Sequence, residues 1–140
     1  SYPVLGLKAT LLDGSYHSVD SSEQAFKTAT IMCFKEALVK AKPVLLEPYV
    51  TIHTYCEETY LGDIMSYFNK HRSRVIGQEI LNDGLMKITA EAPQVEIMKY
   101  AVDLRSITQG QGYYDQKFLD YEYMDKTLEK RVIEAHKKED

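Results

Sequence analysis

Hydrophobic and polar positions alternate over residues 4–12, and this period of two predicts a β-strand. The turn dipeptide Asp13-Gly14 ends the strand, and a helical pattern then runs to about Lys42, just before Pro43. A strand and a helix alone cannot enclose a core, so we interpret this part as the end of a larger domain. The expected apolar stripe of the helix consists of Ala25, Phe26, Ala29, Met32, Cys33 and Leu38.

The start of this helix carries capping signals. Asp20 or Ser21 is expected to cap it, and Glu23 or Gln24 would complete a capping box. His17 lies just before the cap and is either an idle loop residue or a residue that approaches a phosphate beside the positive helix end.

Residues 43–48 begin and end with proline and mark a predicted domain boundary. Beyond them, segments with strand-like alternation take turns with segments of helical period. The predicted strands are 49–56, 74–81, 85–92 and 113–123; the predicted helices are 59–72, 95–108 and 125–138, with a hairpin turn at Asn82-Asp83-Gly84.

The order strand–helix–strand–strand–helix–strand is that of a ferredoxin-like α+β fold. We expect a four-stranded antiparallel sheet with both helices on one face, preceded by the partial strand–helix unit. The predicted division of the chain is therefore 1–42, 43–124 and a C-terminal helix or tail at 125–140.

Composition narrows the possible classes of function. The chain has 140 residues and a net charge of −4, which argues against a general nucleic-acid binder but leaves room for a local basic patch. No apolar run is long enough for a membrane span and no signal peptide is recognisable, so we expect no membrane partner and a cytoplasmic location. Cys33 and Cys56 are expected to be buried free thiols, with a single disulfide as the alternative.

Several kinds of chemistry have no motif in this sequence. There is no phosphate loop of the form GxxxxGKS/T, no CxxC, and no histidine pair at metal-ligand spacing. Gly110-Gln111-Gly112 follows a helix instead of opening one, so we interpret Gly110 as the C′ residue that stops the helix. We expect no catalytic residue, cofactor or metal in this chain, and no enzyme activity of its own.

Two groups of side chains could contact RNA. Lys70, Arg72 and Arg74 lie where a helix meets a strand; they either stabilise the helix C-terminus or contact phosphates. In the helix at 95–108, Arg105, Ser106 and Gln109 share a face with Val102, and this face is either simply solvated or suited to a phosphodiester or base edge.

Four separated stretches of the sequence resemble bacterial elongation factor G. They are DGSYHSVDSSEQAFKTA (13–29), PVLLEP (43–48), ETYLGDIM (58–65) and YAVDLRSITQGQG (100–112), and the similarity runs in order from about Tyr2 to Tyr123. The resemblance implies that residues 1–42 correspond to the last strand and helix of domain IV and residues 43–124 to domain V. GTP and Mg²⁺ would then be bound by a GTPase domain that lies outside this chain.

The resemblance also implies a function and partners. Elongation factor G promotes GTP-dependent translocation of transfer RNA and messenger RNA on the ribosome. In that family, the loop similar to Ser15-Tyr16-His17 reaches the decoding site, transfer RNA and messenger RNA. Domain V lies near the L11 stalk base, and the residues that match Arg105, Ser106 and Gln109 face the sarcin–ricin loop.

The sequence departs from the family at a few motif positions. Ser73 replaces a usual turn glycine, Gln111 replaces a usual arginine, and Met98-Lys99 replaces a common Phe-Gly, so a divergent paralogue is indicated. Two alternatives stay open: a ribosomal-protection protein of the tetracycline-resistance type, and a stand-alone ferredoxin-like module that binds RNA or protein. The strand at 4–12 would have a free edge, so we also expect a homodimer through it.

Overall fold

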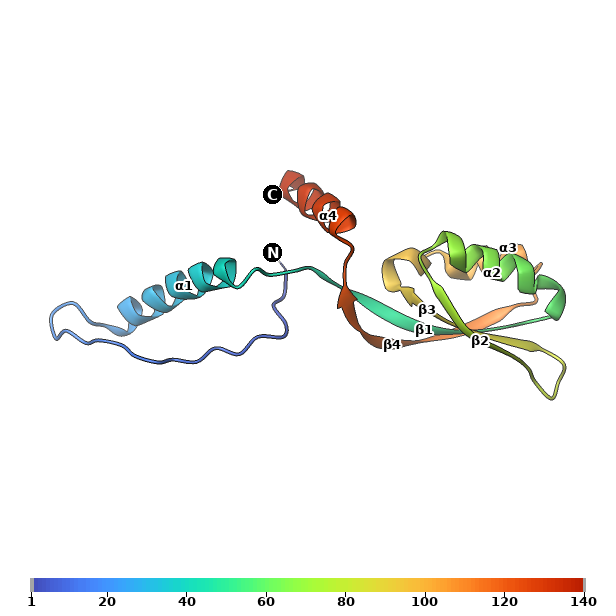
Figure 1. Cartoon of the computed structure of the whole chain (residues 1–140), viewed down its shortest axis with the longest axis horizontal. Helices are drawn as coiled ribbons and strands as arrows, with labels where there is room; N and C mark the ends of the chain where they lie inside the picture. The colour runs from blue at the N-terminus through green and yellow to red at the C-terminus, as the bar shows by residue number, and fades with distance from the viewer. Residues whose placement is uncertain (1, 140) are drawn as a thin grey trace. The chain divides into compact units, whose positions relative to one another are not determined.

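The computed structural model describes residues 2–139, which form two compact units on either side of the Pro43–Val44 bond. The first unit contains an extended segment followed by helix α1 (Glu23–Lys40), and the second contains a sheet with its helices (Figure 1).

The predicted strand at 4–12 does not form. Residues 2–22 contain no strand and no helix, and the side chains of Leu11 and Leu12 are 93% and 91% exposed. A strand is stable only when its backbone N–H and C=O groups pair with a neighbour, and no described residue pairs with this segment. The alternating pattern therefore predicts the extended backbone correctly, but the prediction of a strand is wrong.

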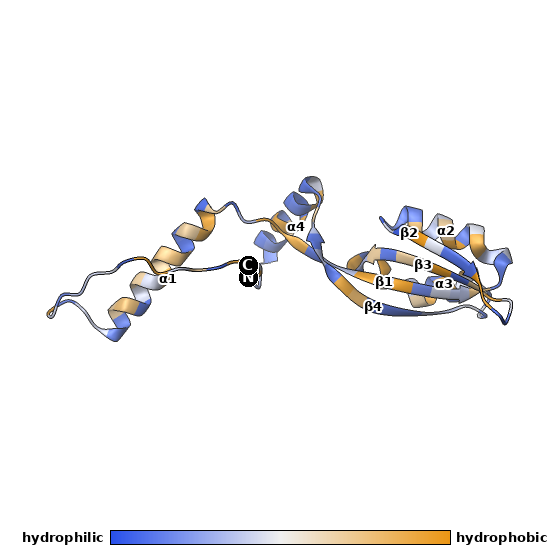
Figure 2. Cartoon of the chain, turned by 60° about the horizontal axis from the view of Figure 1, so that its bottom comes forward, coloured by the Kyte–Doolittle hydropathy of each residue, from blue (hydrophilic) through white to orange (hydrophobic). Residues whose placement is uncertain are grey.

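Helix α1 forms without burying any residue. Local interactions stabilise it: the Ser22 side chain caps it, and Glu23–Lys27 and Glu36–Lys40 are ion pairs at i,i+4. Figure 2 shows hydrophobic residues along α1; of the predicted stripe, Phe26 and Met32 are 47% and 66% exposed, and Leu38 is half-buried. The Cys33 thiol is free but likewise exposed, so the prediction that it is buried is wrong.

The second unit has the predicted ferredoxin-like α+β fold. Its four strands form one antiparallel sheet in the order β2-β3-β1-β4, and α2 and α3 lie on the same face of the sheet (Figure 1). The elements are β1 (Leu46–Cys56), η1 (Glu58–Tyr60), α2 (Leu61–Lys70), β2 (Arg74–Ile80), β3 (Met86–Pro93), η2 (Gln94–Ile97), α3 (Tyr100–Ile107), β4 (Tyr113–Tyr123) and α4 (Lys126–Glu139).

The core of this unit follows from the alternation of strand residues. Every second residue of β1 from Val50 to Cys56 is buried, and the residues between them lie on the opposite face of the sheet. The helices cover the buried face with apolar side chains at i, i+3 and i+4 spacing. The fully buried side chains include Ile52, Thr54, Cys56, Ile64, Phe68, Ile88, Tyr100 and Leu104.

Two tyrosines place phenol groups in this core. Tyr100 is completely buried and its Oη lies 2.6 Å from the Thr54 Oγ1, while Tyr67 donates to the Asp103 carboxylate at 3.1 Å. Burial is the main cause that raises the pKa of both phenols above the ordinary value. Both tyrosines therefore keep their protons in the folded state well into alkaline solution.

We predict that stability decreases above about pH 10, the ordinary pKa of tyrosine. Below that pH the raised pKa values contribute in full; above it, the unfolded chain releases protons that the folded chain retains. Each buried tyrosine should lower the free energy of unfolding by about 1.4 kcal/mol per pH unit. Urea unfolding between about pH 9 and pH 11 measures this slope, and Tyr67→Phe should reduce it, whereas Tyr123→Phe, at an exposed position, should not. An unchanged slope in Tyr67→Phe would contradict the prediction.

Candidate functional site

The predicted RNA-contact residues fall at three places in the structure. Ser15, Tyr16 and His17 precede α1; Lys70, Arg72 and Arg74 surround the end of α2; Arg105, Ser106 and Gln109 lie at the end of α3. The first place belongs to the first unit of the chain, and the other two belong to the second.

A closed turn fixes the backbone of the loop before α1. The His17 N–H donates to the Ser21 Oγ at 2.8 Å, and the Ser21 N–H donates to the His17 carbonyl at 2.9 Å. Because this turn uses the Ser21 hydroxyl, the cap moves on by one residue, and the Ser22 Oγ accepts the Ala25 N–H at 3.1 Å. The prediction of Asp20 or Ser21 as the cap is therefore wrong, and Glu23 pairs with Lys27 instead of completing a capping box.

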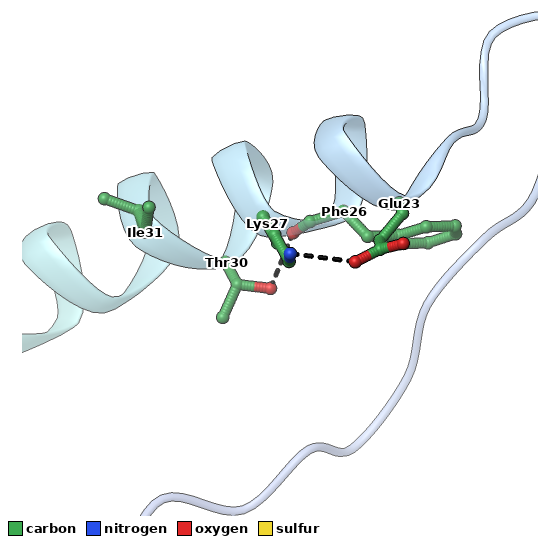
Figure 3. Close-up of a pocket in the computed structure, with 5 residues that line it drawn as sticks. All are labelled: Glu23, Phe26, Lys27, Thr30 and Ile31. Carbon is green, nitrogen blue, oxygen red and sulfur yellow. Dashed lines mark hydrogen bonds and ion pairs between the residues drawn. The ribbon is translucent and has the colours of Figure 1, made fainter.

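The aromatic residue of this loop rests on the helix that follows. The Tyr16 ring is stacked on Phe26 with centroids 6.4 Å apart and planes 8° apart, while His17 is exposed. Phe26 also lines an open depression of about 420 Å³, together with Glu23, Lys27, Thr30 and Ile31 (Figure 3). The two charged residues of this depression, Glu23 and Lys27, form an ion pair. Residues 2–139 contain no group of three potential metal ligands. The loop thus combines a hydrogen-bonded backbone turn with an exposed His17 side chain.

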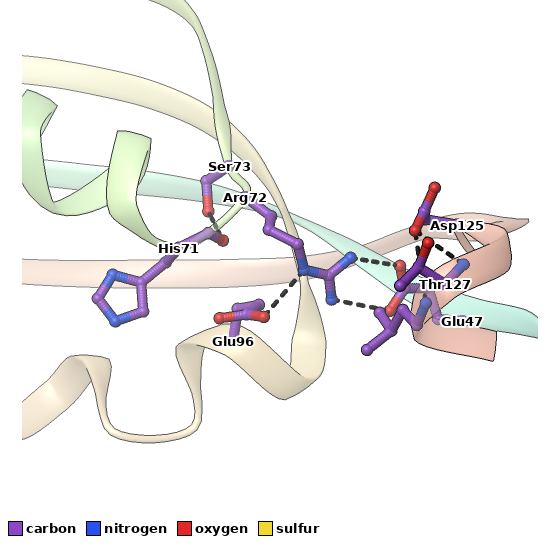
Figure 4. Close-up of polar contacts among 8 residues, drawn as sticks. Glu47, His71, Arg72, Ser73, Glu96, Asp125 and Thr127 are labelled. Atoms are coloured by element: carbon purple, nitrogen blue, oxygen red, sulfur yellow. Dashed lines mark hydrogen bonds and ion pairs between the residues drawn. The ribbon is translucent and has the colours of Figure 1, made fainter. Parts of the chain in front are cut away.

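At the end of α2, Arg72 is held by two acids from other elements (Figure 4). Its guanidinium donates to both carboxylate oxygens of Glu47, at 2.9 and 3.2 Å, and to Glu96 at 2.9 Å. The hydrogen bond to Glu47 is the main cause that raises the pKa of Arg72. The Glu47 side chain is only 5% exposed, so this pair neutralises a buried carboxylate. The Arg72 guanidinium therefore serves to pair acids within the fold.

The other two cations of this group differ from each other. Arg74 donates to the Glu91 carboxylate at 2.6 Å across β2 and β3, and the pairing raises its pKa. Lys70 is exposed and forms no ion pair within residues 2–139. Of the three predicted contact residues here, Lys70 alone keeps a charge that is not shared with an acid of the described chain. These acidic partners could not be recognised from the sequence, because they lie 17 to 25 residues from their arginines.

The turn after α2 also explains why Ser73 can replace the usual turn glycine. Arg72 has a left-handed φ of 50°, and the Ser73 N–H donates to the Phe68 carbonyl at 3.1 Å, as in a Schellman motif. Ser73 itself is not left-handed, so this position does not require a glycine. The left-handed position in this turn is that of Arg72.

At the end of α3, three polar side chains are presented without internal partners. Arg105, Ser106 and Gln109 are exposed, and within the described chain their side chains form no hydrogen bond or ion pair. The helix ends at Thr108 in a second Schellman motif, in which the Gly110 N–H donates to the Arg105 carbonyl at 2.8 Å. Gln109 is the C′ residue with φ 55°, so the prediction that Gly110 holds this position is wrong by one residue. Donors and acceptors of this kind suit a phosphate or a base edge.

Sequence reasoning missed an open depression between α2 and η2. It has a volume of about 400 Å³, and the His71 ring stacks on Tyr67 at 4.0 Å beside it. Two apolar residues of its lining are largely exposed, Met98 at 79% and Val95 at 61%. Only the i,i+4 spacing of Tyr67 and His71 could have indicated this pair. The other lining residues are Glu96, Lys99 and Asp103.

The chain matches two known family models and a solved structure. Residues 44–132 match the family "Elongation factor G C-terminus", and residues 1–42 match "Elongation factor G, domain IV". The chain belongs to the elongation factor G family. A crystal structure of a protein from Thermus thermophilus is similar over 90% of the chain, with 33% identity and a TM-score of 0.80. The chain spans only 19% of that protein's length.

Within residues 2–139, no helix is both long and apolar enough to cross a membrane.

We predict that Arg72→Met destabilises the second unit because it leaves the Glu47 carboxylate buried without a partner. The free energy of unfolding should fall by about 2 kcal/mol, less than for a fully buried pair, because the Arg72 side chain is 35% exposed. Lys70→Met removes a charge two residues away and should change it by less than about 0.5 kcal/mol. Urea unfolding of both variants checks this. Equal stabilities would mean that the ion pairs of Arg72 contribute nothing.

Proposed function

We propose that this chain is the ribosome-binding C-terminal portion of an elongation factor G-type GTPase that promotes translocation of transfer RNA and messenger RNA. The single observation that carries the proposal is the exposed, internally unpaired set Arg105, Ser106 and Gln109 at the end of α3. This set lies within the residues that match the C-terminal family of elongation factor G. Its partner is RNA of the sarcin–ricin loop, with the L11 stalk base nearby.

The first unit is proposed to contact RNA as well. Ser15 and His17 are exposed in its loop, and hydrogen bonds with Ser21 fix the backbone of His17. In this proposal the turn approaches the decoding site, transfer RNA and messenger RNA, in keeping with the match of residues 1–42 to domain IV. Residues 1–42 would then be the end of domain IV and residues 43–124 domain V, acting in the cytoplasm.

The residues of this chain do not fit a bound GTP and Mg²⁺. The sequence has no phosphate loop, and residues 2–139 have no group of three potential metal ligands. We therefore place nucleotide and metal binding in a GTPase domain outside these residues, and assign this chain a binding role without catalytic residues.

We predict that Arg105→Ala weakens binding of the chain to salt-washed ribosomes by about tenfold, the loss expected for one charge-assisted hydrogen bond. If Arg105 contacts a phosphate, the slope of log affinity against log salt should also fall by about 1. Co-sedimentation at several salt concentrations measures both quantities.

Lys117→Ala is the matched control for this experiment. It removes the same charge from an exposed position on β4. Its binding should equal that of the unchanged chain. If Arg105→Ala and Lys117→Ala bind alike, the α3 surface is not the contact.

We also propose that two copies of the chain associate through residues 4–12. Extended backbone with unpaired N–H and C=O groups readily pairs with another chain, and Leu5 and Leu7 in this segment are about half exposed. Light scattering after size exclusion should give twice the 16.1 kDa chain mass at high concentration. Leu7→Lys should restore the monomer and Met98→Lys, in the second unit, should not. A monomer at every concentration would refute the association.

A further inference from the structure

The segment that ends α3 contains a residue that is both buried and polar. Thr108 is completely buried, its Oγ1 donates to the Leu104 carbonyl at 2.7 Å, and the same oxygen accepts the Gly112 N–H at 2.8 Å. One hydroxyl therefore ties the last turn of the helix to the chain four residues beyond it. Burial makes both hydrogen bonds costly to lose, because water cannot replace them.

The two glycines of Gly110-Gln111-Gly112 serve different purposes in this turn. Gly110 is left-handed, with φ 83°, in open space. Gly112 is not left-handed, but a Cβ there would lie 2.7 Å from the Thr108 Cγ2 and 2.8 Å from its Oγ1. Gly112 thus allows the close approach to Thr108, which a side chain at position 112 would block.

Between these fixed points lies Gln109. Its φ of 55° is unfavourable by about 1 kcal/mol for a residue with a Cβ. The Gly110 N–H bond to the Arg105 carbonyl closes the turn on one side, and the Thr108–Gly112 contact closes it on the other. If the second contact were absent, Gln109 could relax to an ordinary conformation and turn its side chain elsewhere.

We propose that Thr108 and Gly112 form a lock that holds Gln109 left-handed and so directs its side chain toward the same partner as Arg105. Thr108 is a positioning residue in this inference, which rests on the proposed function because the direction of Gln109 matters only if that surface binds. The lock itself is a property of the chain alone and can be tested without a partner.

The lock is tested first by amide hydrogen exchange and NMR of the complete chain. Thr108→Val keeps the shape of the side chain and removes the hydroxyl, so exchange of the Gly112 amide should accelerate about fivefold. The Gln109 chemical shifts should move away from left-handed values. Thr108→Ser keeps the hydroxyl and should preserve both features. Unchanged exchange and shifts in Thr108→Val overturn the lock, whether or not the chain binds ribosomes.

Positioning is tested by a double-mutant cycle on binding to salt-washed ribosomes. Thr108→Val and Gln109→Ala should each weaken binding by about fivefold, and the double variant should be no weaker than Gln109→Ala. Thr108→Ser should bind like the unchanged chain even if its melting temperature falls. Additive losses, or a loss in Thr108→Ser equal to that in Thr108→Val, overturn positioning through Gln109. A Gln109→Ala that binds normally, while Arg105→Ala does not, also overturns it but leaves the proposed function standing.

Discussion

The guanidinium of Arg72 joins three segments that lie far apart in the sequence. It holds Glu47 at the start of β1 and Glu96 in η2, and it belongs to the turn between α2 and β2. The same turn ends α2 with its buried side chains in place, and η2 leads directly into α3. One charged group thus ties the turn after α2, and η2 before α3, to the strand that pairs with β3 and β4. Arg72 itself lies outside the surface at the end of α3.

The two units differ in what stabilises their helices. In the second unit, α2 and α3 form because their apolar sides cover the sheet, and their buried residues belong to one cluster. In the first unit, α1 has a side-chain cap and two ion pairs but no buried residue. Isolated helices are marginal in water when local interactions alone support them. We therefore expect the second unit to account for the cooperative unfolding of the chain.

Sequence reasoning succeeded where a local pattern determines the structure. The alternating pattern of residues 49–56 predicted a strand where β1 forms, and the order of strands and helices predicted the antiparallel sheet of the ferredoxin-like fold. It failed where the outcome depends on a partner: residues 4–12 have the strand pattern but nothing to pair with in the described chain. The acidic partners of Arg72 could not be predicted either, because they are 24 and 25 residues away in the sequence. The left-handed backbone at Gln109 was not predicted, because the neighbouring glycine is the more common kind of C′ residue.

In the second unit, two helices end with a left-handed residue other than glycine. The two residues differ in the interactions that offset their backbone strain. Arg72 gains three charge-assisted hydrogen bonds in its unusual conformation, which readily offset a strain of about 1 kcal/mol. Gln109 gains no side-chain hydrogen bond from the described chain, although a glycine at its position would remove the strain. Backbone strain persists only where the surrounding structure holds it, here through the Gly110 N–H bond and the Thr108–Gly112 contact, and it is most frequent at functional sites. Arg72 therefore belongs to the framework of the fold, whereas the strain at Gln109 fits the binding surface that we propose at the end of α3.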